Sequence, residues 1–593
     1  ITDGGSQPMK SHCGRFVIIF NGEIYNFNEL KIELELDTSI FWRGHSDTEV
    51  LIECIAQWGL NTTLSKLNGM FSFALFDRVK NNLTLARDRF GEKPLYIYSS
   101  LNSFAFSSEL KPIELFTNSL TINESAVQAQ LQYSYIPAPY SIYNEVFKLL
   151  PGHFVEIDLV SYTKVSLDNI KPYWEVREAV QKGLAMRRNF KCLGDAIEET
   201  EKVLLKSVKQ RMISDVPIGA FLSGGIDSTC ITALMQENAS NPIKTFSIGF
   251  NDDNYNEAHH AKEVANILGT EHNEMYLCPN DMLEFVPKLA DIYDEPFADS
   301  SQLPTLMVSK FAREQVTVAL TGDAGDEVFS GYNRYLHGPK LVNSYSKYPQ
   351  ALRSCIGSTV QSISPLTYNK FAVALSKLIP KLKRYKRVGD NIHKLAGVID
   401  FIDEKDLYKK LIIAWPDSAM SDEVIDISTD IQEAFNFEGI SLAERMMWQD
   451  TIGYMQNDIL TKVDRASMAS SLETRVPFLD NDVYQHSWAL PLEFKIHNGL
   501  TKYPLRKLIS KYIPNHIMNR PKSGFGVPID SWLRKELKGW GEELLSTQSL
   551  AKSGLFQIKM IQELWNKHQS GSINAQYALW NVLMFQQWLT REK

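Results

Sequence analysis

The stretch FLSGGIDST, residues 221–229, decides the fold of the region around it. An apolar segment, residues 216–222, runs directly into two glycines, and apolar residues then recur at helical spacing from 226 to 234. This pattern predicts a strand, a tight loop and a helix. Glycines let a backbone approach a ligand closely, and the start of a helix carries partial positive charge, so the loop is suited to bind phosphate.

Hydroxyl and carboxylate side chains extend the chemistry of this loop. Ser223, Ser228 and Thr229 supply hydroxyl groups, and Asp227 is a typical ligand for a hard cation such as Mg²⁺. The alternative is that the two glycines mark only a sharp turn. The motif SGGIDS resembles the pyrophosphate-binding loop of ATP pyrophosphatases, which cleave ATP between the α and β phosphates. It differs from the GxxxxGKS/T loop of kinases. The resemblance implies adenylation of a substrate.

A chain of 593 residues is long enough for two or three domains. Its composition is typical of a globular protein, because 44% of the residues are hydrophobic and 22% are charged. No run of about 18 apolar residues occurs, so we expect no membrane-spanning segment and no membrane partner. The net charge of −8 argues against a surface that binds nucleic acid. Six scattered cysteines without a CxxC pair predict reduced thiols and a cytoplasmic location.

The N-terminal part of the chain predicts a β-rich domain. Strands are expected over residues 16–20, 70–77, 83–88, 93–97 and 104–108. The phrase NGEIYN (21–26) contains an Asn-Gly pair, which by itself signals a hairpin turn. The phrase GHSDTE (44–49) opens an amphipathic helix, for which Ser46 or Asp47 is a candidate N-cap.

Five N-terminal phrases, NGEIYN, SDTEV, GMFSFALFD, ARDRFGEKPLY and FSSELK, together resemble the N-terminal-nucleophile glutaminase domain of glutamine-dependent asparagine synthetases. The resemblance implies an α+β sandwich of two sheets covered by helices (αββα). It implies that Asn21 and Gly22 form an oxyanion hole, where a side-chain amide and a backbone N–H stabilise the tetrahedral intermediate. It also implies that Glu23 and Asp47 bind the α-amino group of glutamine, beside Asn21 and Gly22.

The resemblance fails at the start of the sequence. Family members begin Met-Cys-Gly, and the cysteine exposed by removal of Met is the nucleophile, with its own α-amino group as base. The present sequence begins Ile1-Thr2-Asp3, which resembles a family segment several dozen residues further on, past an arginine that binds the glutamine carboxylate. We therefore expect the chain as written not to hydrolyse glutamine. Cys13 precedes a core strand, and we interpret it as a packed structural thiol.

Strands and helices alternate from residue 195 onward, which predicts a parallel sheet with ligands at the carboxyl ends of its strands. A buried strand at 316–320 leads into TGDAGDE, residues 321–327. Three carboxylates beside two glycines are costly to hold together unless a cation or a polar substrate compensates their charge. A solvated turn is the alternative interpretation, but the position directly after a core strand favours a ligand site.

The phrase GDAGDE resembles the SGEGSDE motif of the same synthetases. The resemblance implies that Asp326 shares Mg²⁺ with Asp227. It places Asp323 at a position, often Glu in the family, that is linked to formation of the acyl-adenylate, and the shorter carboxylate leaves a different acceptor open. The ATP-binding residues that the resemblance implies are Leu222, Ser223, Gly224, Gly225, Asp227, Ser228, Ile248, Thr321 and Gly322.

Further signatures occur near the C-terminus. The phrases that resemble the synthetases are DRASMA (464–469), ETRVPFLD (473–480), KYPLR (502–506) and RPKSGFG (520–526). The last of them implies that Lys522 stabilises the charge that develops on the α-phosphate and on the attacked carbonyl. Residues 335–448 carry no clear motif and predict mainly helices. Their basic cluster KLKRYKR (381–387) is interpreted as a charged helix face or loop and not as a nucleic-acid site.

These patterns predict a glutamine amidotransferase domain at 1–170, a linker at 171–194, and an α/β ATP-pyrophosphatase domain at 195–593 with a helical C-terminal portion. ATP and Mg²⁺ would activate a carboxylate, most simply aspartate, as acyl-AMP with release of pyrophosphate. Ammonia, supplied directly or from glutamine, would then displace AMP. We expect all substrates to be small molecules. We also consider that two copies of the chain assemble as a homodimer.

Two alternatives remain open at this point. A related enzyme amidates another carboxylate, such as a sugar uronate of surface polysaccharides, or closes a ring as β-lactam synthetases do. A relative of another class binds nucleotide or glutamine without catalysis, although the combined SGGIDS, GDAGDE and Lys522 set argues against it. The glutaminase-like N-terminal part disfavours other ATP pyrophosphatases, such as tRNA-thiolating enzymes.

Overall fold

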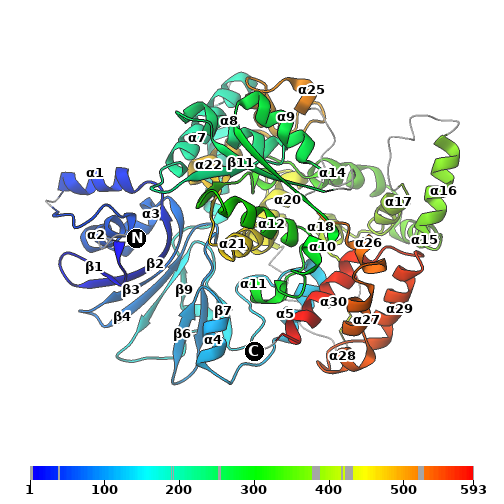
Figure 1. The fold of residues 1–593 in the computed structure, drawn as a ribbon, viewed down its shortest axis with the longest axis horizontal. Helices are drawn as coiled ribbons and strands as arrows, with labels where there is room; N and C mark the ends of the chain where they lie inside the picture. Colours follow the sequence, from blue (N-terminus) through cyan, green and yellow to red (C-terminus); the bar gives the residue numbers. More distant parts are fainter. Residues whose placement is uncertain are drawn as a thin grey trace.

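The computed structural model describes residues 5–37, 40–187, 190, 192–250, 256–376, 388–415, 419–420, 432–518 and 526–591 (Figure 1). Two features singled out above, the basic cluster 381–387 and Lys522, lie outside these described residues. Among the helices in the described ranges, none is long and apolar enough to cross a membrane.

Two antiparallel sheets form the N-terminal part. The larger sheet has the order β1 (Met9–Lys10), β2 (Phe16–Ile24), β3 (Gly69–Asp77), β4 (Asn82–Arg87), β8 (His153–Asp158) and β9 (Ile170–Pro172). The smaller sheet has the order β6 (Phe104–Ser107), β5 (Tyr96–Ser99) and β7 (Val146–Lys148). Successive residues of β5 point to opposite faces of the smaller sheet. Ile97 is buried in the core between the two sheets, whereas Tyr96 and Tyr98 are buried in the core on the other face of the smaller sheet.

Helices cover both outer faces of these sheets. The face of β2 packs with α2 (Asp47–Trp58), which lies beside α1 (Phe27–Asp37) and α3 (Leu60–Lys66). The opposite side of the smaller sheet packs with α4 (Lys111–Phe116) and α5 (Glu124–Tyr133). The predicted αββα sandwich is therefore confirmed.

Two local predictions in this part are wrong. Residues 21 and 22 do not form a turn, because β2 continues through them and pairs Asn21 with Ser72 and Gly22 with Phe71. The backbone of β3 approaches so closely that a Cβ on Gly22 would lie 2.0 Å from the carbonyl oxygen of Met70, and this explains the glycine. Cys13 is exposed and not packed, since it lies in the turn before β2.

A parallel sheet organises the second half. Its order is β12 (Glu271–Leu277), β11 (Lys244–Phe250), β10 (Ile218–Phe221), β13 (Val318–Leu320) and β14 (Glu473–Arg475). One face packs with α7 (Leu193–Arg211), α8 (Ile226–Asn238) and α9 (Ala258–Leu268), and the other packs with α12 (Gln302–Arg313), as Figure 1 shows. The predicted α/β architecture is confirmed, because the strands are parallel and helices pack on both faces of the sheet.

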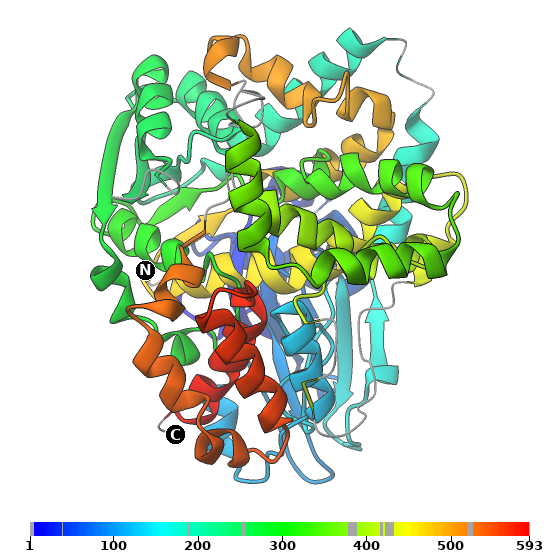
Figure 2. The same ribbon diagram turned by 90° about the vertical axis from the view of Figure 1, so that its right-hand side faces the viewer.

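The region after β13 is mainly helical, as predicted. A continuous helical run is formed by α20 (Leu442–Asp450), a π-helical segment η5 (Thr451–Ile459) and α21 (Leu460–Met468). A π-helix is rare and is frequently found at functional sites. The last helix, α30 (Gln576–Leu589), packs against α5, where the side-chain amide of Asn581 donates to the Leu131 carbonyl over 2.6 Å (Figure 2). The C-terminal helices therefore share a core with the N-terminal part.

Candidate active site

Hydroxyl groups shape the loop between β10 and α8. The Ser223 N–H donates to Ser228 Oγ over 3.2 Å, and the two hydroxyl oxygens lie 3.0 Å apart. Gly224 has a φ of +69°, and a Cβ there would lie 2.9 Å from the backbone nitrogen of Ala261 in α9. Gly225 stands at the start of α8 and has no side chain with which to cap the helix. A helix start of this kind, without a side-chain cap, is suited to bind an anion.

The two loops singled out in the sequence rest on each other. They follow β10 and β13, which are neighbours in the parallel sheet. A Cβ on Gly322 would lie 2.6 Å from the Ser228 backbone nitrogen, and a Cβ on Gly325 would lie 2.6 Å from Asp227 Oδ1. Only glycine fits at these two points. The glycines of GDAGDE therefore allow its carboxylates to approach the loop between β10 and α8, which is predicted to bind phosphate.

A lysine to which the sequence analysis assigned no role joins the two loops. Lys502 precedes α24 (Tyr503–Ile509) and is only 4% exposed. Its ammonium group contacts Asp227 Oδ2 and lies 2.6 Å from Asp326 Oδ1. Burial opposes the charged form of this group, but the two carboxylates outweigh burial and raise the pKa of Lys502. Lys502 is therefore a protonated counter-ion that holds Asp227 and Asp326 close together.

The pair Asp227 and Asp326 has the chemistry that a Mg²⁺ ion requires. Both side chains offer carboxylate oxygens, and both converge on the Lys502 ammonium group. Mg²⁺ at nucleotide sites is commonly bound by one or two carboxylates together with phosphate oxygens. Within the described ranges, no cluster of three or more His, Cys, Asp or Glu side chains offers a complete metal site. The two carboxylates fit a cation that shares its coordination with a nucleotide.

Gly331 gives a direct test of this arrangement. A Cβ there would lie 1.9 Å from Asp326 Oδ1 and 2.0 Å from Lys502 Cε. We expect Gly331→Ala to displace both groups and to lower ATP-dependent pyrophosphate release by about tenfold or more, since small misplacements of catalytic groups have large effects. The matched control is Gly539→Ala in α27 (Lys538–Leu544), where a Cβ meets nothing within 4 Å. Equal activity of the two variants would contradict the assignment.

Asp323 lies close to a buried network of charged side chains. Burial raises the pKa of its carboxyl, and the nearby Lys462 acts in the opposite direction. Lys462 belongs to α21, and its Nζ lies 3.0 Å from Asp299 Oδ2. Asp458 of η5 belongs to the same network, where burial and the charge of Asp299 raise its pKa well above the ordinary value. The π-helical segment and α21 therefore border the position predicted to form the acyl-adenylate.

Three of the residues predicted to bind ATP are almost fully buried, namely Leu222, Ile248 and Thr321. The Leu222 N–H donates to the Phe246 carbonyl over 2.9 Å, and the Thr321 N–H donates to the Arg475 carbonyl over 3.0 Å. Ile248 lies within β11 as part of the core. Their N–H groups pair with neighbouring strands or their side chains pack in the core. These residues therefore support the loops from the sheet below.

The residues predicted to bind glutamine come from β2 and from the start of α2. The Asn21 side-chain amide donates to Ser108 Oγ over 3.2 Å. Asp47 Oδ2 accepts the Ile24 N–H over 2.8 Å, and burial raises the pKa of Asp47 although such N–H groups act in the opposite direction. The N-cap of α2 is Ser46 and not Asp47. The structure thus brings the end of β2 and the start of α2 together.

Glu23 of this group is paired with an arginine of the parallel sheet. Arg475 of β14 lies with Nη2 3.3 Å from Glu23 Oε2 and with Nε 2.6 Å from Glu473 Oε1. Burial raises the pKa of Glu23 to about 8, while the charge of Arg475 opposes this shift. The Arg475 carbonyl also accepts the Thr321 N–H. Arg475 therefore connects Glu23, which is predicted to bind glutamine, with the loop after β13.

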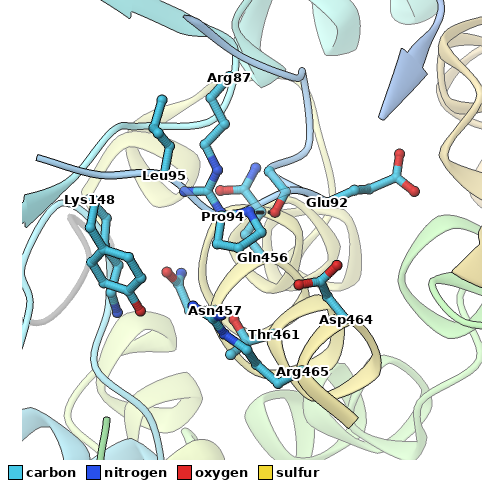
Figure 3. Close-up of a pocket in the computed structure, with 12 residues that line it drawn as sticks. Arg87, Glu92, Pro94, Leu95, Lys148, Gln456, Asn457, Thr461, Asp464 and Arg465 are labelled. Atoms are coloured by element: carbon cyan, nitrogen blue, oxygen red, sulfur yellow. Dashed lines mark hydrogen bonds between the residues drawn. The ribbon is translucent and has the colours of Figure 1, made fainter. Parts of the chain in front are cut away.

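A cavity of about 30 Å³, enough for one water-sized molecule, lies between segments from the two halves of the chain (Figure 3). It is lined by Arg87, Gly91, Glu92, Pro94, Leu95, Tyr96, Lys148, Gln456, Asn457, Thr461, Asp464 and Arg465. Two ion pairs hold this lining, because Lys93 Nζ lies 2.9 Å from Asp464 Oδ1 and Lys148 Nζ lies 2.6 Å from Glu295 Oε2. The phrases ARDRFGEKPLY and DRASMA therefore meet at the junction of the two halves.

The cavity is connected to both predicted sites through α21. Arg465 of this helix donates to the Ser108 carbonyl over 2.8 Å, and the Ser108 hydroxyl is the partner of Asn21. One turn earlier on the same helix, Lys462 lies near Asp323. The roles of Arg465 and Lys462 were not predicted from the sequence, although Arg465 belongs to the motif DRASMA.

Glu92, which lines the cavity, predicts a pH effect on stability. Its Oε2 has no hydrogen-bond partner among the described residues, and burial raises its pKa to about 8, with the charge of Asp88 acting in the same direction. Because the folded pKa exceeds the unfolded one of about 4.5, the folded state binds more protons, and stability falls as pH rises through this window. We expect Glu92→Gln to remove a fall of up to ~5 kcal/mol.

The measurement is the melting temperature of both proteins at pH 5.5 to 8.5 in steps. The melting temperature of the unsubstituted protein should fall relative to that of Glu92→Gln as the pH rises. Glu536→Gln is the control, because Glu536 is exposed and its substitution should leave the pH profile unchanged. Parallel profiles for all three proteins would contradict the prediction.

The comparisons with known proteins agree with this geometry. The family model for asparagine synthase matches residues 199–590, and the one for the glutamine amidotransferase domain matches residues 1–174. Asparagine synthetase [glutamine-hydrolyzing] 1 of Bacillus subtilis (strain 168) is 32% identical over 592 residues, which is 99% of this chain and 87% of that protein.

Two further relatives carry similar names. A putative asparagine synthetase [glutamine-hydrolyzing] of Mycobacterium tuberculosis (strain H37Rv) is 32% identical over 97% of this chain and 84% of its own length. Putative asparagine synthetase [glutamine-hydrolyzing] 2 of Methanocaldococcus jannaschii is 34% identical over 78% of this chain and 83% of its own length. The fold and the paired loops define an amidotransferase fused to a parallel-sheet synthetase. The chain belongs to the asparagine synthase family.

Proposed function

We propose that the protein uses ATP to amidate a carboxylate, with L-aspartate as acceptor and L-asparagine as product. Glutamine or ammonia supplies the nitrogen, and AMP and pyrophosphate are released. The observation that carries this proposal is the contact between the loops at 222–228 and 321–326 through Lys502. It places a phosphate-type loop, two carboxylates and a buried ammonium group together. Family membership supports aspartate as the acceptor.

Each group of the synthetase site has a proposed task. The backbone and hydroxyl groups of residues 223–228 hold the phosphates of ATP. Asp227 and Asp326 hold Mg²⁺, which neutralises phosphate charge when it is bound. Asp323 orients the acceptor carboxylate for attack on the α-phosphate. Lys522, outside the described residues, is proposed to stabilise the negative charge of the transition state.

The N-terminal site has a proposed role in supplying nitrogen. Asn21 and Gly22 stabilise the oxyanion during hydrolysis of the glutamine amide, and Glu23 and Asp47 hold its α-amino group. We assign the nucleophile to no residue of the printed sequence. Ammonia would pass along the interface near the cavity, where α21 extends from the neighbourhood of Ser108 to that of Asp323.

The test is pyrophosphate release by the purified chain with MgATP and aspartate, with ammonium or glutamine in separate reactions and with asparagine measured in parallel. We expect activity with ammonium, equal amounts of pyrophosphate and asparagine, and loss of both on chelation of Mg²⁺. Release with another carboxylate but not with aspartate would overturn the acceptor. No release with any of a panel of carboxylates would overturn the proposed amidation.

The other sequence predictions complete the proposal. The domain limits at 170 and 195 are supported by the ranges of the two family matches. A homodimer and a cytoplasmic location stay predictions from the sequence.

A further inference from the structure

The charge of the chain is very unevenly distributed. Residues 328–389 contain eleven Lys and Arg residues and no Asp or Glu, whereas the whole chain has a net charge of −8. The described cations of this stretch include Lys340, Lys347 and Lys370, all of which are exposed. The net charge that argued against an anionic partner is therefore an average that conceals a strongly basic region.

Exposed apolar side chains form a stripe in the same region. Four residues recur at helical spacing along or next to α15 (Gln350–Gln361): Tyr348, Leu352, Ile356 and Ile363, with exposed fractions of 54%, 48%, 49% and 41%. We call them the α15 stripe. The spacing places Leu352 and Ile356 on one side of the helix, and Tyr348 and Ile363 lie just beyond its two ends. In the next helix, α16 (Pro365–Ser376), Phe371 is 67% exposed beside Lys370.

An adjacent side of α15 is fixed to the protein, which holds the stripe in place. The Arg353 guanidinium is buried and donates to the carbonyl groups of Ile399 and Phe401 over 2.6 and 2.9 Å. Gly357 lies against α17 (Val388–Ala396), where a Cβ would meet the Ala396 carbonyl oxygen at 2.7 Å. Figures 1 and 2 show α15, α16 and α17 at one side of the molecule, away from the antiparallel sheets.

We propose that the α15 stripe, together with the exposed cations Lys347 and Lys370, docks on an anionic lipid surface. Apolar side chains that enter the boundary of a bilayer and cations that meet its headgroups together give peripheral binding, and no spanning helix is needed. Residues 328–389, which include α15 and α16, contain no Asp or Glu, so these two helices add no charge that an anionic surface would repel. This inference goes beyond amidation and replaces the expectation that the chain has no membrane partner.

Two other occupants fit the surface less well. A second copy of the chain that covered the stripe with its own would bring two basic regions together, which charge repulsion opposes. A nucleic acid would use the cations, but Leu352 and Ile356 would gain nothing from phosphate contacts. The lipid surface is the occupant that uses both the charge and the apolar side chains.

The test is flotation of the full chain with vesicles of phosphatidylcholine, with and without phosphatidylglycerol, at low and high salt. We expect binding only to the anionic vesicles, and weaker binding at high salt because screening reduces the attraction. The double variant Leu352→Gln/Ile356→Gln should lower binding by about tenfold or more, and so should Lys347→Glu/Lys370→Glu. Pyrophosphate release should stay unchanged, so the result is independent of the proposed function.

Matched controls change similar residues elsewhere. Leu115→Gln replaces an 88% exposed leucine of α4, and Lys80→Glu/Lys209→Glu reverses two exposed lysines outside the basic region. Neither control should reduce binding. No binding to anionic vesicles, or binding that the α15 variant leaves intact, would overturn the proposal. A dimer that Leu352→Gln/Ile356→Gln dissociates, or a preference for nucleic acid over vesicles, would overturn it as well.

Discussion

Asp227→Asn is expected to lower pyrophosphate release by about 10³-fold, because a neutral amide can neither neutralise a cation nor balance the Lys502 charge. The side chain lies where the two loops meet, against Gly325 and within contact of Lys502. Since Asn has nearly the same shape, the packing against Gly325 should survive. The measurement is the rate of pyrophosphate release with ammonium and aspartate, together with the melting temperature.

Asp195→Asn is the control, because Asp195 is an exposed carboxylate in the first turn of α7. Its rate should match that of the unsubstituted protein within a small factor. A rate for Asp227→Asn that is equally close would remove Asp227 from the metal and nucleotide site. A large fall in melting temperature for Asp227→Asn alone would indicate that the residue serves mainly the fold.

Lys502→Met is expected to destabilise the protein by about 3 kcal/mol or more, because removal of one partner leaves buried carboxylates without a counter-ion. Methionine keeps most of the length of the side chain but not its charge. Without the ammonium group, Asp227 and Asp326 repel each other, which raises their pKa values in the folded state. The destabilisation should therefore grow as pH rises and shrink as the carboxylates become protonated at acidic pH.

Thermal unfolding at pH 5 and pH 8 gives the measurement. The double variant Lys502→Met/Asp326→Asn should recover part of the lost stability, since it removes one of the two unbalanced charges. Lys171→Met is the matched control: it breaks the pair with Glu156, which is exposed on both sides and worth little. A Lys502→Met protein as stable as Lys171→Met at pH 8 would show that Lys502 is not the counter-ion of the two loops.

Much of the site follows from chain patterns. The loops at 222–228 and 321–327 each follow a short apolar strand and contain glycine, so the alternation of strands and helices predicted both at the carboxyl end of a parallel sheet. That the two loops meet was implied by the resemblance. The α/β class of the second half followed from this pattern, whereas the αββα sandwich of the first half was implied by the resemblance. The roles given to individual residues, such as Asp323 and Asn21, come from resemblance and remain proposals.

Other parts of the site could not be predicted. Lys502 precedes a helix more than 170 residues beyond Asp326, and although it opens the motif KYPLR, nothing in that motif indicates which carboxylates it will meet. The strand β14 is three residues long, which is too short for a periodic signal. The π-helical segment η5 differs from an α-helix only in its hydrogen bonds. The turn predicted at Asn21-Gly22 failed because strand pairing with β3 overrode a local preference.

The position of β14 has a consequence for how the protein is made. The carbonyl of Arg475 completes the pairing of the Thr321 backbone, and its guanidinium reaches Glu23. During translation, β2, β10 and β13 emerge long before residue 475 does. Until then β13 lacks one neighbour, and an unpaired strand edge is prone to association with other chains. The nascent synthetase half should therefore depend most on chaperones while residues 321–472 are being synthesised, and both sites should be completed in one late step.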